Sequence, residues 1–340
     1  MLRRVISDEY LETREFAFKY TVADDSIGRP VCFDNMDGVK AYLGTQGPNK
    51  AYVAGFYGRK FPKDKDLQKT VRKNEWLGRE LCWDIDMDHY MNIRKNICEC
   101  GTSKTVCNKC LELAKEAVVF LIETLVEDFG VDRDEIVTIF SGRQGFHIWV
   151  RNLTRLFHNE YNFPPKTSTR IEGELRQAIA EYCNLVTEKR RRRNVKGEVE
   201  TKHIISVNVD TLPRSLRERV LNLTFKNLVM KSPPETLKEI KGVKARVWEK
   251  IKIDLCDASG YDVYMKHFSQ LTPAKSKALK SKVLELRYPR FDIGCTKDIH
   301  RIMKIPGGID GSTGNMCVVV DDLESFSLED VPNIRDFIKN

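Results

Sequence analysis

The chain has 340 residues, 57 Lys and Arg against 49 Asp and Glu, a formal net charge of +8, and 10 cysteines. This length can bury the core of one large domain or two without a disulfide scaffold. Its longest apolar runs, such as residues 118–122, are too short to cross a bilayer, and the N-terminus lacks a signal-peptide apolar region. We therefore expect a soluble intracellular protein whose basic charge is compatible with a polyanionic partner.

The first 60 or so residues mix short apolar runs with turn signals, which predicts strands and short helices of a mixed fold. A strand is expected at about residues 80–87. Successive strand side chains point to opposite faces, so Asp84 and Asp86 share one face with Cys82. Their mutual repulsion is relieved by a divalent cation, which makes both carboxylates candidate metal ligands. The alternative is an exposed edge strand with solvated acids.

Four cysteines follow with the spacing C-x-C-x6-C-x2-C: Cys98, Cys100, Cys107 and Cys110. Four thiolates in one short polar segment predict a closed, tetrahedral structural zinc site, which leaves no open position for a catalytic water. Four unrelated buried cysteines are the alternative. The other six are expected to be small buried hydrophobic residues: Cys32, Cys82, Cys183, Cys256, Cys295 and Cys317.

Apolar residues at helical spacing predict a helix over residues 111–126, and two strands are expected at 136–140 and 146–150. The turn between these strands contains two glycines, which allow the backbone to approach a ligand closely. Ser141, Arg143 and His147 supply polar groups suited to phosphate oxygens. An ordinary hairpin with a histidine satisfied near the core is the alternative.

Long charged helical patterns then cover residues 170–193, 215–231, 235–253 and 273–286, with a strand signal at 204–209. They predict a mostly helical insertion subdomain over residues 164–284. Residues 1–163 and 285–340 would form the main domain, with the cysteine motif at 98–110. The basic run at 189–193 is expected at a solvated helix end, with phosphate binding as the alternative.

Near the C-terminus, residues 291–293 and 316–321 are expected to return the chain to the sheet. Asp292 beside a short strand would supply a third acid for metal binding. Arg301 and Lys304, at i and i+3 of a helical turn, would supply positive charge for phosphates. Read alone, Asp292 is more often a turn or cap residue, and the two cations are more often solvated.

Taken together and in this order, these motifs resemble the small catalytic subunit of archaeal and eukaryotic DNA primases. The resemblance covers most of residues 10–160 and 285–325, including residues 29–33 and 52–57. It implies an α+β primase catalytic fold that makes short primers on single-stranded DNA from nucleoside triphosphates. It also implies that Asp84, Asp86 and Asp292 form the catalytic triad and bind two Mg²⁺ or Mn²⁺ ions. The residues it implies at the incoming nucleotide are Arg29, Ser141, Gly142, Arg143, His147 and Lys304.

The resemblance further implies a heterodimer with a large subunit that carries an iron–sulfur cluster, and a location in the nucleoid or cytoplasm of an archaeon or in a eukaryotic nucleus. Two positions depart from the family pattern. Gln144 stands where a second basic residue is common, and Asp310 stands where a triphosphate-facing histidine is common. Three other functions remain open: a self-sufficient primase-polymerase, a zinc-stabilised nucleic-acid-binding protein and a metal-dependent nuclease.

Overall fold

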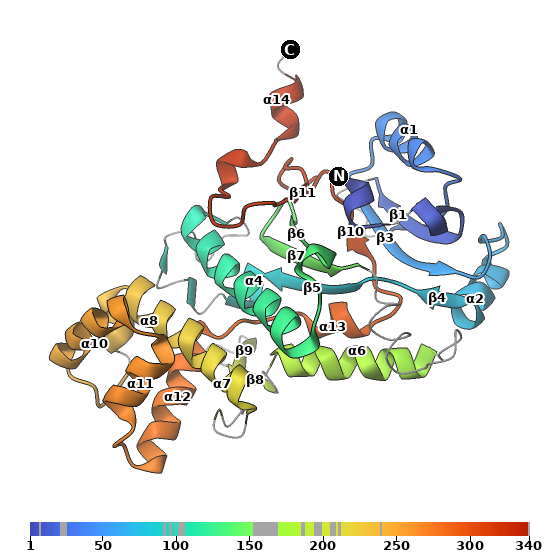
Figure 1. Cartoon of the computed structure of the whole chain (residues 1–340). Helices are drawn as coiled ribbons and strands as arrows, with labels where there is room; N and C mark the ends of the chain where they lie inside the picture. Colours follow the sequence, from blue (N-terminus) through green and yellow to red (C-terminus); the bar gives the residue numbers. More distant parts are fainter. Residues whose placement is uncertain are drawn as a thin grey trace. The chain divides into compact units, whose positions relative to one another are not determined.

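The computed structural model describes residues 1–6, 8–20, 26–90, 93–94, 97–98, 100, 106–151, 169–184, 188–193, 199–204, 209, 212–238 and 240–338. Helices and strands form a mixed fold, as the sequence predicted (Figure 1). The strands are β1 Arg14–Lys19, β2 Gly28–Val31, β3 Lys50–Tyr57, β4 Trp76–Gly78, β5 Leu81–Asp86, β6 Ile136–Phe140, β7 Gly145–Val150, β8 Glu188–Arg193, β9 Val199–Ile204, β10 Met303–Lys304 and β11 Val318–Val319. The helices are α1 Met36–Gln46, α2 Lys65–Asn74, α4 Asn108–Phe129, α6 Thr169–Asn184, α7 Arg214–Val220, α8 Lys226–Lys231, α9 Pro234–Lys238, α10 Ala245–Asp257, α11 Gly260–Phe268, α12 Pro273–Arg287, α13 Ile293–Lys297 and α14 Ile334–Ile338.

The chain divides into two compact units. The sheet unit comprises Met1–Asp86, Val131–Ala180 and Asp292–Asn340, and the helical unit comprises Met87–Gly130 and Glu181–Phe291. Compactness thus groups α4 and the cysteine motif with the helical unit, whereas the sequence grouped them with the main domain. The domain limits at 163/164 and 284/285 stay a prediction.

The sheet unit contains two antiparallel sheets. The first has the strand order β10-β3-β1-β2, with β4 also paired to β3, and the second has the order β11-β6-β7-β5. One hydrophobic core receives Phe16 and Phe18 from the first sheet and Val137, Ile139 and Trp149 from the second. Both sheets therefore bury one face against the same apolar cluster, which removes apolar surface of each sheet from water.

The core-facing side of the second sheet changes from apolar to polar along β5 and β7. Cys82 pairs with Trp149 and both lie in the core, whereas two residues further along Asp84 pairs with His147. Directly opposed residues of an antiparallel pair share one face of the sheet. Asp84 and His147 therefore lie at the edge of the core, on the same face as its apolar residues.

Gly145 permits the close pairing of β7 with β5. A Cβ atom added there would lie 1.7 Å from the carbonyl oxygen of Ile85, far inside van der Waals contact. The same hairpin contains Gly142, whose φ of 76° lies in the left-handed region that favours glycine. Two glycines thus make the tight turn and the strand approach possible.

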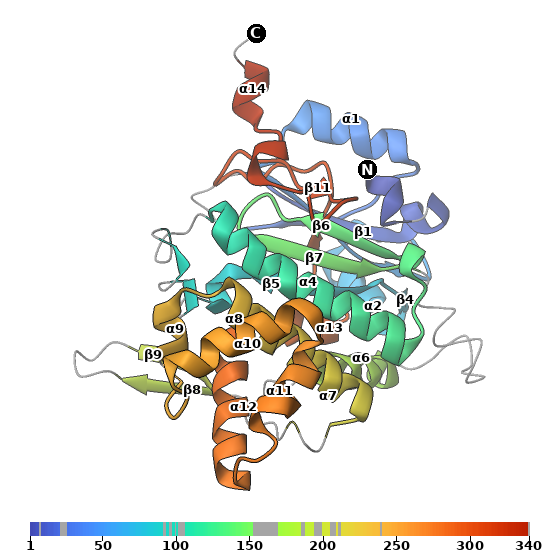
Figure 2. The ribbon, with the colours of Figure 1, turned by 60° about the vertical axis from the view of Figure 1, so that its left-hand side comes forward.

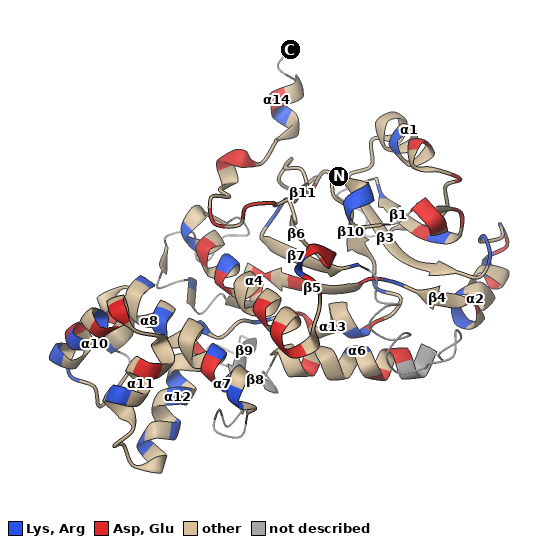
Figure 3. Ribbon diagram, in the orientation of Figure 1, with Lys and Arg blue, Asp and Glu red and all other residues tan. Residues whose placement is uncertain are grey.

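The helical unit is held together by aromatic and charged contacts. Phe225 packs edge-on against Tyr264 and Phe268, with ring centroids 5.3 Å and 6.0 Å apart, and Trp248 of α10 joins this cluster. Asp128 at the end of α4 accepts a hydrogen bond of 2.7 Å from Arg219 of α7. Figure 2 shows α8, α10, α11 and α12 gathered together, and Figure 3 shows lysine and arginine spread over α10 and α12.

Several predicted elements are confirmed. β5 covers most of the expected strand at 80–87, α4 contains the expected helix at 111–126, and β6 and β7 form the expected hairpin. The expected helix at 273–286 is α12.

Other predictions were wrong because local patterns do not reveal where a segment changes conformation. The helix expected over 170–193 ends at Asn184, and the basic run at 189–193 lies in strand β8, paired with β9, instead of at a helix end. The pattern at 235–253 forms two helices, α9 and α10. Most of the expected strand at 204–209 lies outside the described residues, and β9 ends at Ile204.

Two expectations near the C-terminus were also wrong. Asp292 does not enter a strand but precedes the short helix α13. Lys304 lies in strand β10 and not on a helical turn with Arg301. Among the cysteines expected to be buried, Cys256 is exposed and Cys32 is half-buried.

Within the described part of the chain, no helix is both long enough and apolar enough to span a bilayer.

Replacing Gly145 with alanine tests the close approach of β7 to β5. Because the new methyl group would overlap the Ile85 carbonyl, we expect the free energy of unfolding to fall by about 3 kcal/mol in urea denaturation. Gly44 in α1 is the matched control, since a Cβ there meets nothing within 4 Å. Alanine at Gly44 should raise stability by about 0.5–1 kcal/mol. Equal stabilities of G145A and the unmodified chain would contradict the close pairing of β7 with β5.

Candidate active site

The fold brings Asp292 next to the two acids of β5, although it lies far from them in the sequence. The backbone N–H of Asp292 donates to the carbonyl oxygen of Asp84 at 3.0 Å. Asp292 is also the N-cap of α13, where its side chain accepts a hydrogen bond of 2.9 Å from the N–H of Gly294. Asp292 is thus a helix cap, which was the alternative left open by the sequence. It also lies beside Asp84, where a third acid was expected.

The local charge makes ionisation of Asp84 costly. Burial, followed by the negative charges of Asp86 and Asp292, raises the pKa of Asp84 to about 7, although Lys304 and Arg301 act in the opposite direction. A divalent cation would offset this repulsion, and carboxylate oxygens are the ligands that Mg²⁺ and Mn²⁺ prefer. The carboxylates of Asp84, Asp86 and Asp292 are therefore candidate ligands for such ions.

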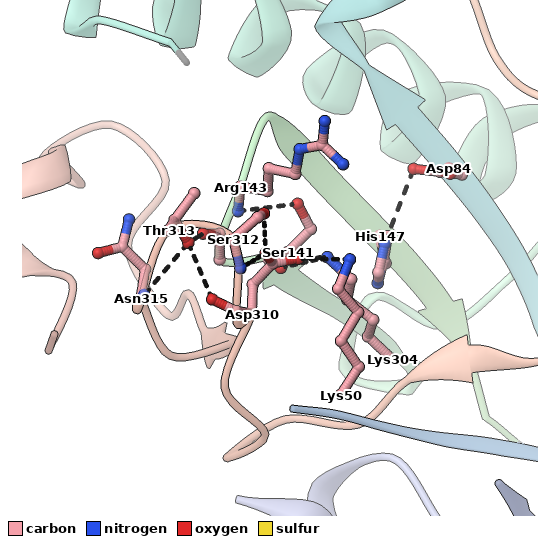
Figure 4. A network of polar contacts seen from close by, with 11 residues as sticks. Lys50, Asp84, Ser141, Arg143, His147, Lys304, Asp310, Ser312, Thr313 and Asn315 are labelled. Atoms are coloured by element: carbon pink, nitrogen blue, oxygen red, sulfur yellow. Dashed lines mark hydrogen bonds and ion pairs between the residues drawn. The ribbon is translucent and has the colours of Figure 1, made fainter. Parts of the chain in front are cut away.

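His147 stands opposite Asp84 on β7 (Figure 4). Its Nε2 lies 3.7 Å from Oδ1 of Asp84, and its side chain is only 7% exposed. Burial, with a smaller contribution from Lys304, lowers the pKa of His147 to about 3, so the ring is neutral at physiological pH. Its buried Nδ1 finds no hydrogen-bond partner among the described residues. A neutral imidazole carries one N–H, so His147 can donate a hydrogen bond but contributes no fixed charge.

The turn at residues 141–145 presents polar groups beside these acids. The Ser141 hydroxyl accepts a hydrogen bond of 3.4 Å from the N–H of Arg143, and the Gly142 carbonyl accepts one of 2.7 Å from Thr313. The guanidinium of Arg143 extends away from the remaining network in Figure 4. The Gly142 carbonyl is therefore bound within the protein, whereas the Arg143 side chain is half-exposed and able to meet a ligand.

Lys304 reaches the same hairpin from the first sheet. Its Nζ donates to the carbonyl oxygen of Ser141 at 3.1 Å and lies 2.5 Å from Oδ2 of Asp310. Lys50, at the start of β3, lies 3.5 Å from the same carboxylate oxygen. Lys50 was not among the residues predicted from the sequence. Strand β3 pairs with β10, and this pairing brings Lys50 and Lys304 together.

Arg29, which the resemblance implied at the nucleotide, takes part in a different ionic network. Its Nε lies 2.6 Å from Oε1 of the fully buried Glu15, and Arg72 lies 2.9 Å from the same oxygen. Arg29 also donates to the carbonyl oxygen of His300 at 3.4 Å. The next residue, Arg301, lies 3.4 Å from Oδ2 of Asp292. These contacts link Arg29 to the site through residues 300–301.

The four cysteines of the helical unit come together as the spacing predicted. Their sulfur atoms all lie within 4.8 Å of one another, and five of the six separations are between 3.0 and 3.9 Å. Tetrahedral zinc with Zn–S bonds of about 2.3 Å places sulfurs about 3.8 Å apart, so the set could hold zinc with small adjustments.

A buried arginine adjoins the cysteines. Arg94 is fully buried and its Nε lies 3.3 Å from Sγ of Cys110, while its Nη2 donates to the carbonyl oxygen of Cys100 at 3.3 Å. Burial raises the pKa of Cys100, but hydrogen bonds from the other three thiols and from Arg94 outweigh it and lower that pKa to about 6. With zinc bound, a guanidinium at this place would offset part of the negative charge of the four thiolates.

Removing two of the sulfurs tests the zinc site. Purified protein should contain one zinc per chain by elemental analysis, and C107S/C110S should lose it, because two ligands do not hold the ion. C256S is the matched control, since Cys256 is exposed and lies outside the cluster. Zinc-free wild-type protein that is fully folded would contradict the assignment.

The raised pKa of Asp84 predicts a pH-dependent cost to stability. Since the folded-state pKa of about 7 exceeds the unfolded value near 3.9, the folded chain binds more protons between pH 4 and 7. Stability therefore falls as the pH rises through that window. In buffer without Mg²⁺ or Mn²⁺, D84N should raise the free energy of unfolding by about 1–2 kcal/mol at pH 8. This range allows for the 27% exposure of the Asp84 side chain.

The gain from D84N should fade toward pH 4, and Mg²⁺ should stabilise the unmodified chain more than D84N. D66N, at an acid of which 86% is exposed, is the matched control and should change stability little at either pH. A D84N gain that is the same at pH 4 and pH 8 would be incompatible with a repelled carboxylate.

Comparison with known proteins places these features in one family. A family model described as DNA primase small subunit matches residues 84–322. The DNA primase small subunit of Schizosaccharomyces pombe is 26% identical over 98% of this chain and 72% of its own length, and that of Saccharomyces cerevisiae is 25% identical over 95% and 76%. The archaeal DNA primase small subunit PriS of Methanosarcina barkeri is 33% identical over 42% of this chain and 32% of its own length. The chain belongs to the DNA primase small subunit family.

Proposed function

We propose that this chain is the catalytic subunit of a primase and makes short primers on single-stranded DNA by nucleotidyl transfer from nucleoside triphosphates. Family membership implies a primer-synthesising enzyme with a larger partner subunit. The observation that carries the proposal is the meeting of three acids from two distant segments with a cationic hairpin: the Asp292 N–H donates to Asp84, and His147 stands opposite Asp84.

The acids would bind the metal ions of the reaction. Nucleotidyl transfer needs the 3′-hydroxyl of the growing strand in line with the α-phosphate, with pyrophosphate leaving on the other side. Two bound Mg²⁺ or Mn²⁺ ions, about 3.5–4 Å apart, would stabilise the attacking and leaving oxygens. Asp84 and Asp86 would hold both ions, and Asp292 would help to hold the one nearer the hydroxyl.

The hairpin and its neighbours would bind the triphosphate. Arg143 offers a planar fork of donors that matches phosphate oxygens, and the Ser141 hydroxyl and a neutral His147 offer one donor each. Lys304 adds a positive charge next to the Ser141 carbonyl. These groups would fix the orientation of the nucleotide and offset its charge without transferring protons. Arg29 would act at the margin of the site, through residues 300–301.

The proposal includes structural zinc at the four cysteines and a large subunit as partner. It also places the protein with the replication apparatus of the cell. A self-sufficient primase-polymerase would need no partner for activity. A nucleic-acid-binding protein without catalysis would bind single strands and incorporate no nucleotide, and a nuclease would shorten strands. Labelled products from triphosphates, analysed with and without a large subunit, separate these functions.

The double variant D84A/D86A tests the catalytic assignment. We expect primer synthesis with Mg²⁺ or Mn²⁺ to fall by at least about 10³-fold, because Asp84 and Asp86 are the two acids of β5 that would hold the ions. The fold should remain, since both side chains lie at the edge of the core. D66A, at an exposed position of α2, should retain full activity. Synthesis at the unmodified rate by D84A/D86A would falsify the assignment.

A further inference from the structure

One acid lies among the cations of the proposed triphosphate site. The side chain of Asp310 is fully buried, and its Oδ2 lies 2.5 Å from Nζ of Lys304 and 3.5 Å from Nζ of Lys50. Its Oδ1 accepts hydrogen bonds from the N–H of Ser312 at 3.0 Å and from the Ser312 hydroxyl. Both oxygens are thus engaged inside the protein. The acid that stands in place of the expected histidine does not face the solvent from which a triphosphate would enter.

The turn that Asp310 begins is attached to the hairpin. Thr313 donates to the Gly142 carbonyl at 2.7 Å, and the N–H of Gly311 donates to the carbonyl of Asn49 at 3.1 Å. A Cβ atom on Gly142 would lie 3.0 Å from the carbonyl oxygen of Asn315, so the turn and the hairpin are in close contact. Asp310 therefore lies where residues 310–315, the hairpin at 141–145 and the start of β3 meet (Figure 4).

The contacts of Lys304 limit what its ammonium group can still bind. An ammonium group has three N–H donors. One is directed to Asp310 and one to the Ser141 carbonyl, which leaves one for a phosphate oxygen. A lysine side chain has much rotamer freedom to lose on binding, and this loss is avoided where the group is already held. A buried carboxylate also needs such a cation, because an uncompensated buried charge is strongly destabilising.

From these contacts we propose that Asp310 is a positioning residue for the nucleotide. Its carboxylate holds the Lys304 ammonium against the Ser141 carbonyl, ready to bind the triphosphate. This inference rests on the proposed function. It gives the acid at position 310 a role, since Asp310 acts through Lys304 and does not touch the nucleotide.

D310N tests the proposal, because asparagine keeps the shape of the side chain and removes its charge. In extension of a preformed primer, we expect the KM for the nucleoside triphosphate to rise about tenfold, with kcat changed by less than about threefold. The expected rise reflects the loss of the carboxylate that holds the Lys304 ammonium group in place. D37N is the matched control, since Asp37 forms an exposed ion pair with Lys40 at 3.1 Å in the same unit. An unchanged or lower KM for D310N overturns the proposal.

A double-mutant cycle tests whether Asp310 acts through Lys304. In a K304M background, D310N should change KM by less than about twofold, because the group that it positions is gone. A further tenfold rise in that background overturns the proposal and indicates a general structural role. Thermal unfolding of every variant shows whether the fold is intact.

If D310N does not fold, D310E provides the same test, because it keeps the charge and displaces it by one methylene group. It should also raise KM, and an unchanged KM overturns the proposal. The test remains separate from that of the proposed function. Failure of the unmodified protein to make any product refutes primer synthesis, whereas an active enzyme whose KM is insensitive to position 310 refutes only the role of Asp310.

Discussion

The antiparallel pairing of β5 with β7 is the constraint on which the candidate site depends. Its register sets Asp84 opposite His147 and Asp86 opposite Gly145. A shift by one residue would turn the acids to the other face of the sheet and expose the apolar residues that replace them. The apolar pairs further along the same strands, such as Cys82 with Trp149, are buried in the core and oppose such a shift. The burial of the core thus places the acids.

Charge balance follows from that placement. Asp84 lies between other acids and gains from a cation, whereas Asp310 is satisfied by two lysines before any ligand arrives. Burial and the lysines act oppositely on Asp310, and the lysines prevail, so its pKa is well below the ordinary range. The two carboxylate environments differ in the sign of their neighbours. In the proposed roles, Asp84 would bind metal and Asp310 would hold the Lys304 side chain in place.

The helical unit shows the same relation between a polar group and its burial. Arg94 has no exposed surface, and its position is explained by the sulfur atoms beside it. Arg219 is likewise almost fully buried and pairs with Asp128 and Glu127 on α4. In both places a guanidinium, which has five donors and stays charged, meets several acceptors at once. These polar contacts add to the aromatic packing of the helical unit.

The sequence alone was sufficient for features that depend on neighbouring residues. The alternation of β5, the glycines of the hairpin and the spacing of the four cysteines each determine local geometry, and the structure agrees with all three. Local pattern was insufficient where two conformations are close in energy. The sequence of residues 188–193 is compatible with a helix, yet this segment pairs with β9. An aspartate such as Asp292 is compatible with a helix cap or with a strand end, and in the structure it caps α13.

Only the tertiary structure decided which groups meet. That Asp292 lies against Asp84, that Lys50 lies beside Lys304, and that Asp310 turns inward follow from strand pairing and loop contacts between distant segments. Periodicity carries no information on such distances, because it reports which face a residue occupies and not what lies across from it. The residue types of the site were therefore readable in the sequence. Their charge balance was not, since it depends on burial and on partners that only folding brings together.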